Sequence, residues 1–197
     1  ADEHRAGIVV YGAARTTLRD LYLHDFTGDG VYVYAPTGGH ASDLLVERVT
    51  ASDNTRNGLT FGGQLDGARV TGSVFTGNGA QQVDTEAPSA TVNRVTLTHS
   101  RLAGPGFALT ISGWATEHLS SDWMVEDNQI DGGINVVWSE RVVIRRNHGV
   151  NAGTSPIRVY RTSRDVTIAD NDWTSTQTSA PALGVIAVIG TEGGAPT

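Results

Sequence analysis

The chain has 197 residues and a formal net charge of −7, and arginine supplies all 14 of its Lys and Arg positions. No cluster of basic residues is present, which excludes a nucleic-acid partner, and no apolar run approaches the ~20 residues of a membrane span, which excludes a membrane partner. The absence of cysteine excludes a disulfide scaffold, and 24 glycines with many valines and threonines favour strands and turns over helices.

A motif of one small residue followed by alternating apolar residues recurs eight times along the chain. The first inward-facing residues are predicted to be Ile8, Val31, Leu59, Val83, Phe107, Ile134, Ile157 and Val185. Steps between them vary from 23 to 28 residues, so the loops change in length while the strand starts are kept. The next inward residues are predicted to be Val10, Val33, Phe61, Leu109, Val136, Val159 and Ala187, interrupted only by Thr85. This pattern predicts a solenoid with a narrow, continuous apolar core.

A second signature, an apolar residue followed three positions later by Asn or Ser, comes after the turn of several repeats. Its polar members are Ser73, Ser100, Asn128, Asn147 and Asn171. Stacked from coil to coil, these side chains would form a ladder that satisfies the backbone groups of the turns. The alternative is that they are scattered turn residues.

With these repeats, residues 7–190 resemble the right-handed parallel β-helix proteins of the pectate-lyase-like superfamily. The resemblance implies an all-β fold, a right-handed single-stranded parallel β-helix solenoid of about eight coils that forms one domain over residues 1–197. Neither end of the sequence resembles a cap. We therefore expect this chain to be a fragment of a longer chain or to have its ends covered by another part.

The same alignment predicts which residues project outward, because side chains alternate across a strand. The first outward row is Val9, Tyr32, Thr60, Asp84, Ala108, Asn135, Arg158 and Ile186, and the second is Tyr11, Tyr34, Gly62, Glu86, Thr110, Val137, Tyr160 and Val188. Aromatic faces stack on sugar rings, and a coil spacing of ~4.8 Å matches the rise of an extended sugar chain. This face is therefore predicted to bind a polysaccharide.

Asp84 and Glu86 are the candidate catalytic residues. They lie ~6.5–7 Å apart along one strand, and side-chain rotation could bring their carboxyl groups to the separation of a retaining or an inverting glycosidase. Two like charges this close raise one pKa, so that one carboxyl stays protonated as an acid. We assign Glu86 as general acid and Asp84 as nucleophile or base, although the sequence does not fix the order. The alternative is a solvated acidic patch on an exposed strand.

The predicted substrate-binding residues surround this pair. They are Tyr32, Tyr34, Thr60, Asn135, Arg158 and Tyr160 on the outward face, with Arg56 and Asp53 on the loop that precedes it. Arg158 lies three coils from Asp84, ~14 Å away, and is expected to bind a distant sugar. No cofactor is expected, although Asp84 and Glu86 could hold Ca²⁺.

Many members of the superfamily are polysaccharide lyases, hydrolases or epimerases. The resemblance therefore implies a polysaccharide hydrolase or lyase that acts on an acidic or neutral polymer outside the cell or at the surface of a bacterium or phage. A non-catalytic structural or adhesive β-helix, such as a surface adhesin or a trimeric virion spike, stays open. A stable trimer with protected tyrosines would favour that second interpretation.

Overall fold

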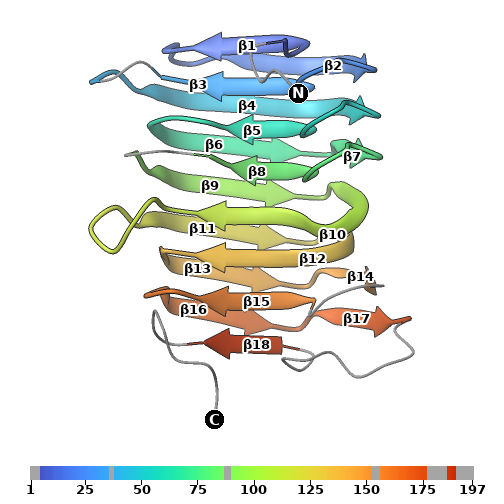
Figure 1. Cartoon of the computed structure of the whole chain (residues 1–197), viewed down its shortest axis with the longest axis vertical. Helices are drawn as coiled ribbons and strands as arrows, with labels where there is room; N and C mark the ends of the chain where they lie inside the picture. The colour runs from blue at the N-terminus through green and yellow to red at the C-terminus, as the bar shows by residue number, and fades with distance from the viewer. Residues whose placement is uncertain (1–4, 36–37, 87–89, 152–155, 177–185, 190–197) are drawn as a thin grey trace.

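The structure is a computed structural model that describes residues 5–35, 38–86, 90–151, 156–176 and 186–189. Over these residues the chain forms strands and turns only, wound into a parallel β-solenoid whose coils stack along one axis (Figure 1). A helix long and apolar enough to cross a membrane is not found in the described ranges. Each coil passes through three faces, which we call sheets 1, 2 and 3.

Sheet 1 is the long face formed by the strands of the repeat motif. It contains β1 (Ile8–Tyr11), β3 (Val31–Tyr34), β5 (Leu59–Phe61), β8 (Val83–Thr85), the second half of β10 (Arg101–Ser112), the second half of β12 (Gln129–Val137), β15 (Ile157–Tyr160) and β18 (Ile186–Ile189). Every pairing between neighbours in this face is parallel. These eight described strands are separated by seven complete turns, which makes the coil count slightly lower than the eight expected.

Sheets 2 and 3 form the other two faces. Sheet 2 contains β2 (Thr17–His24), β4 (Ala41–Ser52), β6 (Leu65–Thr71), β9 (Val92–Thr98), β11 (Ser120–Glu126), β13 (Ser139–Arg145) and β16 (Arg164–Ala169). Sheet 3 contains the end of β4, β7 (Val74–Thr76), the first halves of β10 and β12, β14 (His148–Asn151) and β17 (Asp172–Ser175). Because β4, β10 and β12 run around corners, the faces join into one 18-stranded sheet.

The core lies between the three faces and follows the predicted inward rows over most coils. Ile8 pairs with Val31, Val31 with Leu59, Leu59 with Val83, and Ile134 with Ile157, as the repeat predicts. Most of these side chains are fully buried. Alternation fixed this register because a shift by one residue would turn the whole apolar set toward solvent.

The fifth coil departs from the predicted register by two residues. Leu109, rather than Phe107, pairs with Val83 and with Ile134. The reason is that β10 runs unbroken around the corner from sheet 3 and contains a bulge between Ala103 and Leu109. The start of the repeat was therefore placed too early, and the next outward rows shift with it. Thr110 takes the place predicted for Ala108.

The last strand also departs from the predicted register, by one residue. Ile186 pairs with the inward Ile157, and Ala187 with the outward Arg158. The run from 185 to 189 is entirely apolar, so alternation carries no information about its phase. Val185, predicted as the first inward residue of this coil, lies outside the described residues.

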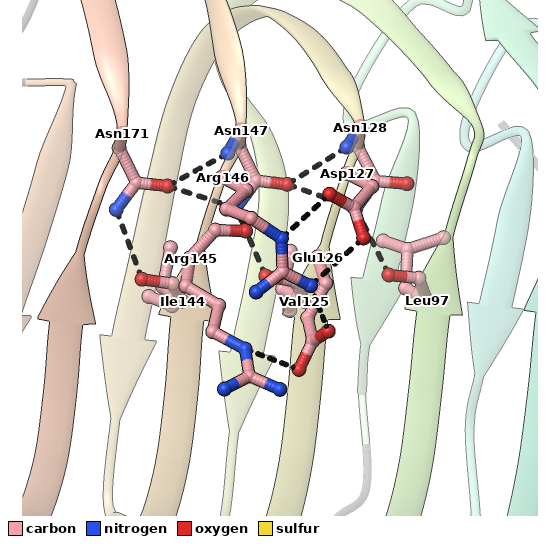
Figure 2. Close-up of polar contacts among 10 residues, drawn as sticks. All are labelled: Leu97, Val125, Glu126, Asp127, Asn128, Ile144, Arg145, Arg146, Asn147 and Asn171. Atoms are coloured by element: carbon pink, nitrogen blue, oxygen red, sulfur yellow. Dashed lines mark hydrogen bonds and ion pairs between the residues drawn. The ribbon is translucent and has the colours of Figure 1, made fainter.

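The predicted polar ladder is confirmed as a chain of hydrogen bonds from coil to coil (Figure 2). The backbone N–H of each member donates to the side-chain oxygen of the next: Ser73 to Ser100, Ser100 to Asn128, Asn128 to Asn147 and Asn147 to Asn171, at 2.9–3.1 Å. A second ladder, at the turn between sheets 3 and 1, was not predicted. There the N–H of Phe26 donates to Asn54 Oδ1 and the N–H of Asn54 to Asn78 Oδ1, both at 3.1 Å.

The corner between sheets 2 and 3 carries a left-handed residue just before each rung of the first ladder. Positive φ is found at Asp20, Arg48, Gly72, His99, Asp127, Arg146 and Asp170. Opposite charges on adjacent coils pair here, with Arg48 Nε 2.7 Å from Asp20 Oδ1 and Arg146 Nε 2.8 Å from Asp127 Oδ1. Non-glycine residues are uncommon in this region of backbone space. Each exposed ion pair adds little stability, but opposite charges on adjacent coils favour the observed stacking of coils.

Candidate functional site

The outward face of sheet 1 brings the predicted catalytic pair and an aromatic residue onto one wall. Asp84 pairs with Thr60, which pairs with Tyr32, so these three form one outward row. Glu86 follows in the second outward row, where its N–H donates to the carbonyl of Phe61 at 2.9 Å. Tyr34 is two coils away in that same row. The wall expected from the sequence is therefore present.

The carboxyl groups of Asp84 and Glu86 influence each other electrostatically on this wall. Asp84 is only 5% exposed, whereas the Glu86 side chain is 34% exposed. Burial, together with the charge of Glu86, raises the pKa of Asp84 to about 7. Arg56 Nη2 donates to both oxygens of Glu86, at 2.6 and 2.7 Å. At neutral pH the pair therefore retains a proton that can be transferred, next to a carboxylate balanced by a guanidinium.

The turn before β5 holds Arg56 over the pair. The N–H of Arg56 donates to the carbonyl of Gly28 at 3.1 Å, which fixes the backbone against the previous coil. The next residue, Asn57, donates from its backbone to Asp29 Oδ1 at 2.9 Å and from its side chain to Thr60 Oγ1 at 2.9 Å. Thr60 is fully buried, so this predicted substrate-binding residue instead supports the turn from beneath.

Asp29 and Asn57 were missed as site residues by the sequence analysis. Asp29 is fully buried and lies 3.8 Å from Arg56 Nε, and burial raises its pKa. The signal that could have found both residues is their equivalent position. Each directly precedes the glycine that opens a repeat strand, Gly30 or Gly58.

Asp53 lies at the other end of the same turn and is not brought to the pair. It has a positive φ of 55°, and its carboxylate lies over Gly77 on the next coil. The turn therefore presents Arg56, and not Asp53, to Glu86. Among the residues that the structure describes, no set of three or more His, Asp or Glu side chains is grouped as metal ligands.

Tyrosines form a stacked group beside the pair on the first coils of sheet 1. The ring centroids of Tyr11 and Tyr34 are 5.6 Å apart, and those of Tyr32 and Tyr34 are 6.1 Å apart. Tyr11 is 61% exposed, but Tyr32 is only 6% exposed because its ring leans over Gly62. Tyr32 was predicted to contact substrate. It is instead a buried support for Tyr34, and the accessible aromatic surface is that of Tyr11 and Tyr34.

Gly62→Ala is expected to destabilise the fold by about 1–3 kcal/mol, a typical cost of overpacking. A Cβ at residue 62 would lie 2.5 Å from Tyr32 Oη, so the ring would have to leave its stacked position. Urea unfolding of Gly62→Ala in the wild-type and Tyr32→Ala backgrounds measures the effect. An equal cost in both backgrounds would contradict the contact.

The remaining predicted site residues lie on the last coils of sheet 1. Asn135 pairs with Arg158 in the first outward row, and Val137 pairs with Tyr160 in the second. The Arg158 guanidinium lies 4.9 Å from the centroid of the Phe107 ring. Phe107 was predicted to point into the core, but the bulge in β10 places its ring beside Arg158 on the outward side.

The separation of the carboxyl groups bears on the chemistry that they could perform. Glycosidase carboxyl groups that flank a sugar are ~5–5.5 Å apart in retaining enzymes and ~6.5–9.5 Å apart in inverting enzymes. Asp84 and Glu86 lie two residues apart along the chain, and the charge of Glu86 acts on the buried Asp84 carboxyl. Carboxyl groups on one wall are suited to an acid and a base that act from the same side of a bound sugar.

Comparisons with known proteins agree with this architecture. Residues 6–183 match the family described as a right handed beta helix region. No curated protein matches the sequence. Among solved structures, the chain is similar to the Streptococcus pneumoniae surface protein and adhesin PfbA, with a TM-score of 0.59 and 11% identity over 90% of this chain. The match covers 49% of that protein's chain, so this chain spans about half the length of its neighbour, and the likeness is one of fold.

Proposed function

Because this chain belongs to the right-handed β-helix family, whose fold presents a long parallel sheet on its surface, we propose that it is a carbohydrate-active protein that binds an extended polysaccharide along sheet 1 and cleaves it with Asp84 and Glu86. The observation that carries the proposal is the burial of Asp84 on the outward wall of sheet 1, two residues from a Glu86 that is paired with Arg56. Burial raises the pKa of Asp84 to about 7, and a general acid works best when its pKa lies near the operating pH.

In this scheme Asp84 is the general acid and Glu86 the base, the reverse of the order assigned from the sequence. Asp84 donates its proton to the oxygen that leaves as the glycosidic bond breaks. Glu86 takes a proton either from an attacking water, which gives hydrolysis, or from the carbon next to a uronate carboxylate, which gives elimination. Arg56 supplies a positive charge beside Glu86.

Tyr11 and Tyr34 provide the platform for neighbouring sugars. Tyr11 is exposed and its ring lies tilted against that of Tyr34, in the same outward row as Glu86, so a polymer lying along the solenoid axis would cross both features. Polymers of this kind are met outside the cell, and we therefore propose an extracellular or cell-surface location.

Glu86→Gln is expected to lower the cleavage rate at least ~100-fold, because general base catalysis contributes that much or more. Wild-type protein is incubated with a panel of acidic and neutral polysaccharides. New reducing ends report cleavage, and the ultraviolet absorbance of an unsaturated sugar separates elimination from hydrolysis. Asp66→Asn is the matched control, because Asp66 is paired with an arginine on sheet 2, away from the site. A Glu86→Gln variant as active as this control would refute the assignment.

Adhesion without catalysis is the second candidate, and two observations favour it. The similar PfbA structure is that of a surface protein and adhesin. The first coil of sheet 1 exposes Val9 and Tyr11, at 48% and 61%, which could pack on a partner or a second copy. Light scattering separates the candidates. A stable trimer with tyrosine fluorescence insensitive to sugars supports assembly, and a monomer with quenched fluorescence supports polysaccharide binding.

A further inference from the structure

Two buried polar atoms without hydrogen-bond partners belong to neighbouring residues on the last coils of sheet 1. They are Asn135 Oδ1 and Arg158 Nε, which belong to paired residues of β12 and β15. Asn135 is 8% exposed. Buried polar atoms are nearly always paired in native proteins, so an unpaired acceptor and an unpaired donor on two paired residues indicate a position that a ligand completes.

Arg158 is held in place by an aromatic ring instead of a carboxylate. Its guanidinium lies 4.9 Å from the centroid of Phe107, and no carboxylate in the described ranges pairs with it. Many other arginines of the chain, such as Arg56 and Arg146, form ion pairs. The positive charge of Arg158 is therefore left for a partner that the described residues do not supply.

A second arginine and two aromatic rings follow this pair along the chain, at and just beyond the ends of β12 and β15. The Arg161 guanidinium lies 4.6 Å from the Trp138 ring centroid and 5.8 Å from that of Tyr160. Trp138 Nε1 is a further buried donor without a hydrogen-bond partner. Apolar ring faces beside several donors suit a sugar that carries a negative charge, in a protein whose own net charge is −7.

The position of this cluster relative to the carboxyl pair sets where along a polymer it would act. Asp84, Thr110, Asn135 and Arg158 are successive members of the first outward row. Three coil steps of ~4.8 Å place Arg158 ~14 Å from Asp84, about the length of three sugars in an extended chain. One polymer could therefore contact both places at once.

We propose that Asn135, Arg158, Tyr160 and Arg161 form a specificity subsite for an anionic sugar, three residues along the polymer from the bond that is cleaved. The inference rests on the proposed polysaccharide function. Arg158 binds the anionic oxygens, and Asn135 accepts a hydrogen bond from a sugar hydroxyl. Either a carboxylate or a sulfate offers these oxygens, and the experiment distinguishes the two.

Affinity gel electrophoresis and calorimetry test the subsite with matched polymers. The probes are polygalacturonate and its carboxyl-reduced form, and a sulfated galactan and its desulfated form. Wild-type protein is expected to bind one anionic polymer at least about tenfold more tightly than its neutral counterpart, because hydrogen bonds to charged groups are worth that much. The preferred anionic polymer identifies the group as carboxylate or sulfate.

Arg158→Gln is expected to remove this preference and leave affinity for the neutral polymer unchanged. Arg158→Lys, which keeps the charge but loses the planar fork, should retain part of it. Arg69→Gln is the matched control, because Arg69 is exposed on sheet 2. Equal binding of anionic and neutral polymers by wild-type protein, or a preference that survives in Arg158→Gln, overturns the subsite, as does failure to bind any anionic polymer.

The outcomes also separate the subsite from the cleavage proposal. Binding that depends on Arg158 without cleavage of any polymer would refute the catalytic role of Asp84 and Glu86 and leave the subsite standing. Cleavage that is insensitive to Arg158→Gln and to the charge of the polymer would do the reverse.

Discussion

Asp84→Asn is expected to slow cleavage by orders of magnitude and, at the same time, to make the protein more stable above neutral pH. Both effects follow from the same feature, a carboxyl group that is 5% exposed and lies near the charge of a second carboxyl group. An amide has nearly the same shape and carries no charge, so it removes the acid without leaving a cavity. A residue kept only for stability would not behave in this way.

The direction of the stability effect follows from the raised pKa. Burial first, and then the charge of Glu86, raise the pKa of Asp84 from 3.8 to about 7. Between these values the folded protein binds more protons than the unfolded chain, so wild-type stability falls as the pH rises from about 4 to about 7. The full loss is on the order of 4 kcal/mol. Asp84→Asn lacks this loss, so its free energy of unfolding should depend less on pH.

Urea unfolding at pH 5 and pH 8 measures the difference. At pH 8 the wild-type protein should be less stable than Asp84→Asn. The difference in their free energies of unfolding should be smaller at pH 5. Asp66→Asn is again the control, because Asp66 is partly exposed and ion-paired. A wild-type protein that becomes more stable as the pH rises through this range would show that Asp84 is ionised in the fold.

Asp84→Asn is also expected to lower the cleavage rate by about 10²–10⁴-fold, which is the usual contribution of a general acid. The loss should appear on whichever polymer the wild-type protein cleaves. Wild-type activity should also decline as the pH rises above about 7, because the acid loses its proton there. A pH–rate profile with no such decline would exclude Asp84 as the acid.

The features that the sequence predicts correctly are those set by local spacing. Alternation places Leu59 and Val83 in one core row, and the Asn and Ser spacing places Asn128 and Asn147 in one ladder. Both patterns repeat at each coil, and a solenoid converts repetition directly into stacking. The outward position of Asp84 follows from the same alternation.

The features that the sequence does not predict depend on how a corner is built. Phe107 looks like the start of a repeat because it follows a glycine, yet Gly106 has a positive φ of 70° inside a bulge. No spacing rule reveals that β10 passes this corner without a break. The error matters for function, because the bulge is what places Phe107 against Arg158.

The repeat pattern of the sequence also does not predict the contacts between turns and strands. Arg56 was expected near the carboxyl pair, but its bidentate contact with Glu86 depends on Asn57 and the buried Asp29. Such contacts join residues about 30 positions apart through side-chain geometry, which alternation does not describe. Tyr32 illustrates the same limit, since its row was predicted and its burial over Gly62 was not.

Asn147→Ala is expected to be among the most destabilising single changes, at about 3–5 kcal/mol, because a buried donor or acceptor left without a partner costs ~1–3 kcal/mol. Asn147 Oδ1 accepts from the backbone and side-chain nitrogens of Asn128, at 3.1 and 2.9 Å, and its Nδ2 donates to the carbonyl of Val125 at 2.9 Å (Figure 2). Alanine would remove the partner of the Asn128 backbone N–H and of the Val125 carbonyl, while the Asn128 amide would keep only its contact with the carbonyl of Leu97.

Comparison with the next rung tests whether this cost comes from the ladder. Asn171 accepts from Asn147 and donates to the carbonyl of Ile144 at 2.9 Å, but it is only half-buried. Water can therefore replace part of the hydrogen bonding that Asn171→Ala removes. The loss of unfolding free energy in Asn171→Ala, measured by urea unfolding, should be clearly smaller than in Asn147→Ala. Equal and small costs, within ~1 kcal/mol for both variants, would mean that water satisfies these backbone groups and that apolar stacking alone sets the register of the coils.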